Sequence, residues 1–290
     1  SPIVPHLTTY VKDDWHFLRT LPHQLDFHNT TLYSVDISSL YTSIPHELGL
    51  EAIENWIQKH KNLIPPRFTK EFILHSIKFI LTHNNFDFDG QLYNQAEGTA
   101  MGTIMAPPYA CLTIRYLEEV KLFPVVLPIY FNESICKHIK ENFKRYMDDG
   151  FTSLLKTVNI ELFLHCLNSL HPSINFTQEM SLLTSENDCL KQQLNFLDIT
   201  VILNENNTVE TDIYYKPTNS HDYLNYNSHH ANHTKENIPF NLAKRIIVFV
   251  SNSVKMEQRL QDLKVYLKNC DYPDNIIDNG IFKARLQGPA

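Results

Sequence analysis

The sequence predicts an α+β fold, in which an antiparallel sheet carries helices on one face and a helical region follows. Short β-favouring segments alternate with segments of helical periodicity along most of the chain. Three further helical segments then follow one another with no strand between them. At 290 residues the chain is long enough for two modules and a sizeable core, and we expect the boundary to separate residues 1–203 from 204–290.

The elements of the first module follow from periodicity and turn residues. We expect one short helix within 1–31, a strand at 32–37, helices at 46–61 and 67–82, a hairpin at 86–93, a helix at 107–121, a second hairpin at 143–155, a helix at 158–170 and strands at 174–180 and 193–203. The turn of the hairpin at 86–93 is an Asp-Gly pair, which favours tight hairpin turns. Residues 122–142 are interrupted by prolines and receive no assignment.

The remaining elements are a strand at 208–215, an irregular polar segment at 216–238, and helices at 239–250, 253–269 and 275–286. No stretch of 18 apolar residues occurs and no secretory signal is present, so we expect an intracellular protein without a membrane span. The five cysteines are scattered, which is typical of free thiols in a reducing compartment. Because the chain starts with Ser1, we interpret it as a fragment of a longer protein.

The net charge of −7 does not favour tight binding of nucleic acid by itself. The charge is unevenly distributed, however, since residues 213–268 carry eight Lys and Arg against four acidic residues. Phosphate binding depends on local basic surface and not on net charge. Composition therefore leaves a nucleic-acid partner possible for the second module.

Two adjacent carboxylates, Asp148 and Asp149, interrupt the predicted hairpin at 143–155. Apolar flanks on both sides indicate two short strands joined by a tight turn, with both aspartates at its tip. Adjacent carboxylates repel each other, and a divalent metal ion between them relieves the repulsion. The alternative is an ordinary polar turn.

A third carboxylate, Asp36, stands at the end of the predicted strand 32–37. A single acid at a strand end is usually only solvated, but this one could complete a two-metal site with the hairpin acids. Gly98 and Gly102 stand just before a predicted helix. Glycine permits close approach of a ligand to the backbone, and a helix N-terminus favours anions. A plain turn before a helix is the alternative.

Taken in order, these segments resemble the palm of a reverse transcriptase, and more narrowly a Penelope-like retroelement polymerase. The residues that carry the resemblance are Asp36–Pro45, Glu97–Gly102, Arg145–Asp149, Asn195–Asp198 and Tyr215–Thr218. The resemblance extends from about Val11 to the C-terminus. It implies a palm at 1–203 and a thumb-like helical region at 204–290.

The resemblance implies an RNA-directed DNA polymerase that works with two Mg²⁺ ions, for which Mn²⁺ may substitute. Asp36 and Asp148 would hold both ions, with Asp149 in support and the Ile37 carbonyl near the nucleotide-side ion. The Tyr41 ring would lie beneath the incoming sugar and exclude a 2′-hydroxyl; a buried structural tyrosine is the alternative. The implied partners are an RNA template, a DNA primer and dNTPs, and the implied location is the nucleus, at the site of integration.

The resemblance also implies contacts to the base pair and the primer. Gly98, Met101 and Gly102 match the segment that packs on the nascent base pair, although retroviral enzymes have Gln where Met101 stands. Met101 as a core residue is the alternative. Phe196 and Leu197 match the primer grip, with Asp198 where many relatives have Gly; a core strand is the alternative.

Two other features allow more than one interpretation. Arg145 could contact a nucleic-acid backbone or pair with an acid. The histidines at 221, 229, 230 and 233 invite a zinc interpretation, but no cysteine or carboxylate completes a familiar spacing, so we expect an irregular loop.

Other functions remain open at this point. A truncated or domesticated remnant would bind nucleic acid without catalysis, and an RNA-dependent RNA polymerase would need room where Tyr41 stands. The short segment before Asp36 has only Lys12 and Arg19 as strong cations. Because a reverse transcriptase places its triphosphate-gripping fingers there, we expect this chain alone to polymerise poorly. Nothing in the sequence resembles the GIY-YIG nuclease that often accompanies Penelope-like polymerases.

Overall fold

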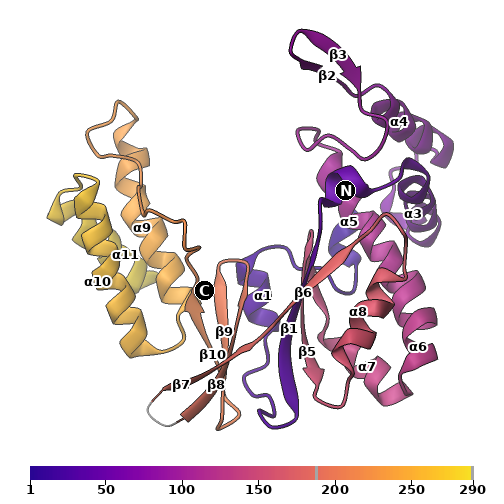
Figure 1. Cartoon of the computed structure of the whole chain (residues 1–290). Coiled ribbons are helices and arrows are strands. Elements are labelled where there is room, and N and C mark those ends of the chain that lie inside the picture. Colours follow the sequence, from indigo (N-terminus) through magenta and orange to yellow (C-terminus); the bar gives the residue numbers. More distant parts are fainter. Residues whose placement is uncertain (187–188, 289–290) are drawn as a thin grey trace. The chain divides into compact units, whose positions relative to one another are not determined.

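The computed structural model describes residues 1–186 and 189–288 (Figure 1). They form two compact units. The first comprises Ser1–Phe17 and Asn29–Met180, and the second comprises Leu18–His28 and the residues from Ser181 onward. The division between the two compact units therefore falls after Met180, whereas we expected a boundary after residue 203. The strands that follow residue 181 pair with one another in a sheet of their own, so they group with the C-terminal helices.

The first unit is built on a four-stranded antiparallel sheet. Its strands are β1 (Thr30–Ile37), β4 (Lys144–Tyr146), β5 (Asp149–Leu155) and β6 (Phe176–Met180), in the order β4-β5-β1-β6. The register sets Val35 of β1 opposite Gly150 of β5, and Asp36 opposite Thr177 of β6. Strand β1 is therefore central, and its end lies beside the start of β5.

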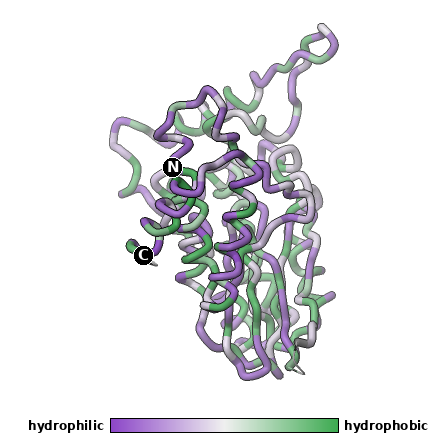
Figure 2. The backbone as a smooth tube through the Cα atoms, turned by 90° about the vertical axis from the view of Figure 1, so that its left-hand side faces the viewer, coloured by the Kyte–Doolittle hydropathy of each residue, from purple (hydrophilic) through white to green (hydrophobic). Residues whose placement is uncertain are grey.

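Helices cover one face of this sheet, as the sequence predicts. Alternate residues of β1, Tyr33, Val35 and Ile37, belong to the hydrophobic core, where α7 (Glu133–Asn142) packs on β5 and α8 (Ile160–Asn168) packs on β6. Because successive side chains of a strand point to opposite faces, Asp36 is on the other face, and it is exposed. Figure 2 shows hydrophobic and hydrophilic stretches interspersed along the backbone.

Three longer helices complete the first unit: α3 (His46–Lys59), α4 (Lys70–Thr82) and α5 (Ala106–Tyr116). Trp56 of α3 is fully buried and donates a 2.8 Å hydrogen bond from Nε1 to the Leu112 carbonyl of α5. Helix α5 continues through a π-helical segment, Leu117–Val126, into α6 (Leu127–Tyr130). Pro124 within this segment has no amide N–H, so a regular α-helical ladder is interrupted there.

The smaller elements are the 3₁₀ turns Val4–His6 and Lys61–Leu63, the short helices α1 (Asp14–Thr20) and α2 (Leu40–Ser43), and the hairpin of β2 (Asn85–Phe88) with β3 (Gln91–Asn94). The hairpin confirms the prediction from its Asp-Gly turn. Among the described residues, no helix combines the length and apolar character needed to cross a membrane.

The second unit has an antiparallel sheet and three helices. The strands β7 (Leu182–Glu186), β8 (Cys189–Phe196), β9 (Ile199–Asn204) and β10 (Val209–Ile213) are ordered β10-β9-β8-β7. The helices are α9 (Asn232–Phe249), α10 (Ser253–Asn269) and α11 (Asp274–Gln287).

Two predictions for this unit were wrong. The single strand expected at 193–203 is a hairpin, because Leu197 adopts a left-handed conformation (φ 54°) and reverses the chain between β8 and β9. Helix α9 begins before Pro239, not at residue 239. Helix α9 packs closely on α11 at this proline, since a Cβ added at Gly280 of α11 would lie only 2.7 Å from the Pro239 Cβ.

Candidate active site

The hairpin between β4 and β5 presents the two adjacent aspartates. Tyr146 pairs with Asp149, so Met147 and Asp148 form a two-residue loop, and Met147 has a left-handed backbone (φ 50°). Asp148 is therefore at the tip, whereas Asp149 is the first residue of β5. The expectation that both aspartates lie at the tip was wrong, because the strand pairing extends one residue further than the sequence indicated.

The sheet register brings the third acid, Asp36, to the same place. The β1–β5 register ends at the Val35–Gly150 pair, and Asp36 and Asp149 each lie one residue beyond it. Facing residues of antiparallel strands have Cα atoms about 4.5–5.5 Å apart and side chains on the same face. The backbone positions of Asp36, Asp148 and Asp149 thus lie at one end of the sheet. Asp36 is on the face opposite α7 and α8, where Phe17 of α1 contacts Phe151.

These acids fit a hard divalent cation by their chemistry. Magnesium prefers carboxylate oxygens, keeps several waters, and is usually bound by one or two carboxylates together with substrate phosphates. Asp36 is exposed and Asp148 and Asp149 are half-buried, so the carboxylates are accessible. No three His, Cys, Asp or Glu side chains among the described residues converge into a complete metal-ligand set. The acids therefore offer carboxylate oxygens to a cation without forming a complete ligand set by themselves.

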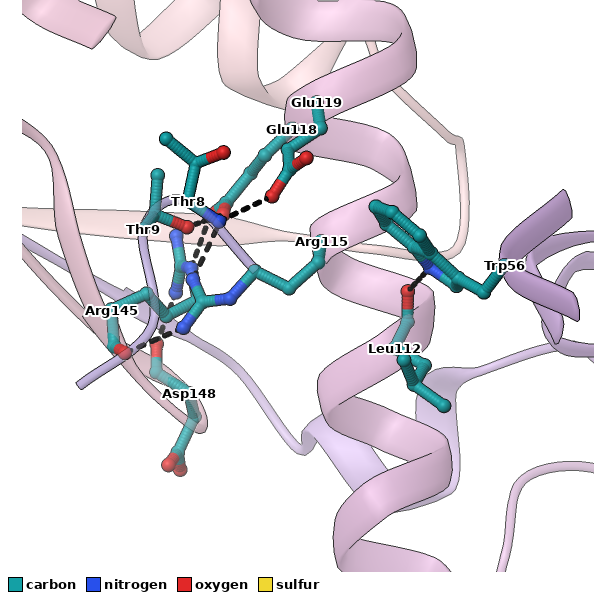
Figure 3. Close-up of polar contacts among 9 residues, drawn as sticks. All are labelled: Thr8, Thr9, Trp56, Leu112, Arg115, Glu118, Glu119, Arg145 and Asp148. Atoms are coloured by element: carbon teal, nitrogen blue, oxygen red, sulfur yellow. Dashed lines mark hydrogen bonds and ion pairs between the residues drawn. The ribbon is translucent and has the colours of Figure 1, made fainter. Parts of the chain in front are cut away.

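A buried ionic network lies behind the turn (Figure 3). The Arg145 guanidinium forms an ion pair with Glu118 through Nε and donates a 2.8 Å hydrogen bond from Nη1 to the Asp148 carbonyl oxygen. Glu118 also accepts hydrogen bonds of 2.9 Å from Arg115 and from the Thr9 hydroxyl. Arg145 is only 1% exposed, so it pairs with an acid and is not available to a nucleic-acid backbone.

The network stays ionised despite its burial. Burial by itself would raise the pKa of Glu118, but the Arg145 and Arg115 guanidiniums together hold that pKa below its ordinary value. Burial lowers the pKa of Arg145, and the Glu118 carboxylate opposes this shift. The two guanidiniums share the Glu118 carboxylate, so each buried arginine has an acidic partner, and removing that carboxylate would be strongly destabilising.

Tyr41 lies close to the turn. It stands in α2 and is half-buried. Burial raises the pKa of its hydroxyl, and the next contribution in the same direction comes from the Asp148 carboxylate. The two side chains are therefore near enough to interact electrostatically.

The segment around Gly98 packs on the main chain of Tyr41. The Thr99 amide donates a 2.7 Å hydrogen bond to the Tyr41 carbonyl, and His46 Nε2 lies 2.9 Å from the Gly98 carbonyl oxygen. Gly98 has φ 72°, and a Cβ there would lie 2.5 Å from the Tyr41 carbonyl oxygen. Glycine is therefore required by the fold at this position.

Other predicted residues differ in accessibility. Met101 is 68% exposed, which excludes the core alternative for it, and Gly102 is exposed as well. Ile37 has its side chain in the core, so only its main chain is available to a ligand.

The predicted primer-grip residues belong to the second unit. Phe196 is 3% exposed and packs as a core strand residue, whereas Leu197 is half-buried at the β8–β9 turn. Asp198, which replaces the glycine of many relatives, forms an ion pair with Arg245 of α9. The turn therefore offers its backbone and Leu197, but not the Phe196 ring.

The histidine-rich segment is structural at His221. Its ring stacks on Tyr266 with 3.8 Å between centroids, and the Tyr215 ring meets it edge-on. The cysteines are all free thiols.

Sequence reasoning missed Glu118, Arg115 and His46 as parts of the site. A weak signal was present, because Arg115 and Glu118 are spaced as an i, i+3 ion pair within an otherwise apolar helical segment. The 27-residue separation between Glu118 and Arg145 carries no local pattern.

Comparison with solved structures identifies the fold. The telomerase of Candida albicans, in complex with a TWJ fragment of telomeric RNA, aligns with 96% of this chain and 50% of its own, at a TM-score of 0.58 and 11% identity. Apo telomerase of Candida tropicalis aligns with 97% of this chain and 51% of its own, at a TM-score of 0.50 and 13% identity. The fold is that of a reverse-transcriptase palm and thumb.

The similarity to these telomerases is limited in extent. The chain spans about half of their length, and at this low sequence identity the similarity shows the fold alone. Residues 222–282 match the model of the animal helix-turn-helix domain, which covers α9, α10 and most of α11. No curated protein matches the chain.

Proposed function

We propose that the chain is the palm and thumb of an RNA-directed DNA polymerase of a Penelope-like retroelement. The single observation that carries the proposal is that Asp36 and Asp149 flank the Val35–Gly150 pair at one end of the palm sheet, with Asp148 in the adjoining turn. The ordered motifs from Asp36 to Thr218 support the narrower Penelope-like assignment, and the telomerase-like fold supports the polymerase class.

In this proposal the three carboxylates hold two Mg²⁺ ions, and Mn²⁺ can substitute. When bound, such ions neutralise the charge on the attacking and leaving oxygens of a phosphoryl transfer. The chain itself contributes positioning. Asp36 is fixed by central strand β1, Asp148 by the tight turn, and the Tyr41 ring beside Asp148 limits space for the 2′-hydroxyl of an incoming nucleotide.

The proposed partners are an RNA template, a DNA primer and dNTPs. Two of the similar telomerases are described in complex with a fragment of telomeric RNA, which supports an RNA partner for this fold. The match of residues 222–282 to a helix-turn-helix model supports nucleic-acid binding by the second unit. We place its action in the nucleus, at the site of integration.

Primer extension tests the proposal. Because the chain alone is expected to polymerise poorly, it is tested beside a protein in which an N-terminal fingers region precedes it, and both receive an RNA template, an annealed DNA primer, dNTPs and Mg²⁺. We expect Asp36→Asn and Asp148→Asn each to lower extension by about 100-fold or more, because each removes a charge that the reacting phosphate requires. Asp89→Asn is the matched control, since Asp89 is also an exposed turn aspartate but lies in the β2–β3 hairpin.

Equal activity of the Asp36 and Asp148 variants and the control would refute the proposal. RNA binding without extension even by the protein with the added fingers region would favour the second candidate, a binding module without catalysis. The helix-turn-helix match is the observation that favours that candidate. Equal use of rNTPs and dNTPs would instead favour an RNA polymerase.

A further inference from the structure

The two-residue turn of Met147 and Asp148 is held from its buried side by one arginine. Arg145 precedes the turn, its side chain is on the face of the sheet that packs against the helices, and its Nη1 donates to the Asp148 carbonyl. In Figure 3 the Asp148 carboxylate points away from this hydrogen bond. The main chain of Asp148 is thus fixed from inside while its side chain remains free to bind.

The arginine is itself fixed from several directions. Glu118 holds its Nε, the N-terminal segment holds its main chain through Thr9 and Val11, and Arg115 donates to its carbonyl. The backbone bonds to Thr9 and Val11 measure 2.8 and 2.9 Å. A guanidinium held in this way has one orientation, so the carbonyl that it binds has one as well.

Two features of the turn indicate that it needs this support. Met147 adopts a left-handed backbone conformation, which costs a non-glycine residue about 1–2 kcal/mol. Gly150 leaves the space that the guanidinium fills, since a Cβ there would lie 3.1 Å from Arg145 Nη2 and 2.6 Å from Val35. The left-handed backbone at Met147 and the space at Gly150 are both needed only if the turn keeps one fixed orientation.

We propose that Arg145, anchored by Glu118, is a positioning residue that orients Asp148 for metal binding. This inference rests on the proposed function, because it assumes that Asp148 is a metal ligand. The positioning role of Arg145 can be distinguished from a purely structural role by measurement. A structural ion pair would affect unfolding, whereas a positioning residue affects metal affinity in protein that is fully folded.

The test measures Mn²⁺ binding to the purified chain by calorimetric titration, at a temperature where every variant is folded. Arg145→Lys keeps the charge but cannot reach both Glu118 and the Asp148 carbonyl in the same geometry. We expect it to weaken Mn²⁺ binding about 10- to 100-fold, the usual effect of removing a group that orients a ligand. In primer extension, kcat should fall by a similar factor while KM for primer–template is unchanged.

Leu167→Ala is the control for loss of stability. Leu167 is fully buried in α8 and takes no part in the network, so its truncation destabilises the same unit without touching the turn. Its Mn²⁺ affinity should equal that of the unaltered chain. Glu118→Asp provides a second variant in case Arg145→Lys does not fold, since it retains the charge but draws the guanidinium away from the turn. We expect it to weaken Mn²⁺ binding about tenfold.

Asp148→Asn separates failure of this inference from failure of the proposed function. Weakened Mn²⁺ binding in Asp148→Asn but not in Arg145→Lys or Glu118→Asp would overturn the positioning role and leave the metal site standing. Unchanged Mn²⁺ binding in Asp148→Asn would overturn the metal site, and the positioning role with it.

Discussion

The Thr99 amide donates a 2.7 Å hydrogen bond to the carbonyl oxygen of Tyr41. This bond joins the segment that follows the first candidate aspartate to the glycine segment before α5, although the two are far apart in sequence. Both segments are among the motifs that resemble a polymerase palm. Because the contact involves the Tyr41 main chain, it explains why position 98 must be glycine.

The contact predicts that Gly98→Ala is strongly destabilising. The added Cβ would meet the Tyr41 carbonyl oxygen at 2.5 Å and the Thr42 Cα at 2.6 Å, both backbone atoms, and φ is 72°. We expect a loss of about 2–4 kcal/mol in the free energy of unfolding, measured by urea denaturation. Gly102→Ala is the control, because nothing lies within 4 Å of its added Cβ and no loss is expected. Equal losses for both variants would contradict the packing described.

Tyr41 should determine sugar selection if the chain is a polymerase. Removing the ring in Tyr41→Val opens space beside Asp148, so we expect the preference for dNTP over rNTP to fall about tenfold or more. Tyr41→Phe keeps the ring and removes only the hydroxyl, so it should retain the preference. Competition between dNTP and rNTP in primer extension measures this. A preference that Tyr41→Phe loses and Tyr41→Val keeps would exclude steric exclusion by the ring.

In the second unit, Arg259 should contribute more to stability than an exposed arginine pair. Arg259 donates to both carboxylate oxygens of Asp212, at 3.1 and 2.9 Å, and Asp212 is buried beneath it. We expect Arg259→Lys to cost about 1–2 kcal/mol, since lysine cannot make both bonds. Arg285→Lys, in an exposed pair with Glu257, should cost less than about 0.5 kcal/mol. Urea denaturation distinguishes them, and equal costs would contradict the role of burial.

Alkaline pH should weaken the stabilising interaction between Tyr116 and Glu51. Burial, reinforced by a hydrogen bond to the Glu51 carboxylate, raises the pKa of Tyr116 to about 12. Because the folded-state pKa exceeds the unfolded value of about 10, this contribution is complete below pH 10 and is lost between about pH 10 and 12. The stability difference between the unaltered chain and Tyr116→Phe should therefore shrink from about pH 9 to about pH 11. A difference that stays constant over this range would contradict the raised pKa.

Local sequence patterns determined most elements of the first unit. The strand before Asp36, the Asp-Gly hairpin and the two-strand pattern around Asp148 all formed as predicted. Turn chemistry and periodicity act over a few residues, so the sequence displays them directly. Local signals failed in the second unit, where Leu197 reverses the chain without a glycine and Pro239 lies inside a helix. Packing against other elements overrides local preference at such positions.

The sequence by itself named the three aspartates, Tyr41 and Gly98, because their residue types and order carry chemical meaning. Only the tertiary structure decided how they meet. Strand register set Val35 opposite Gly150, which places Asp36 and Asp149 at the same end of the sheet, and burial made Arg145 the partner of Glu118. The physical reason is that register and ion pairing depend on contacts between distant segments. Those contacts gain their energy only when the core is assembled and water is excluded.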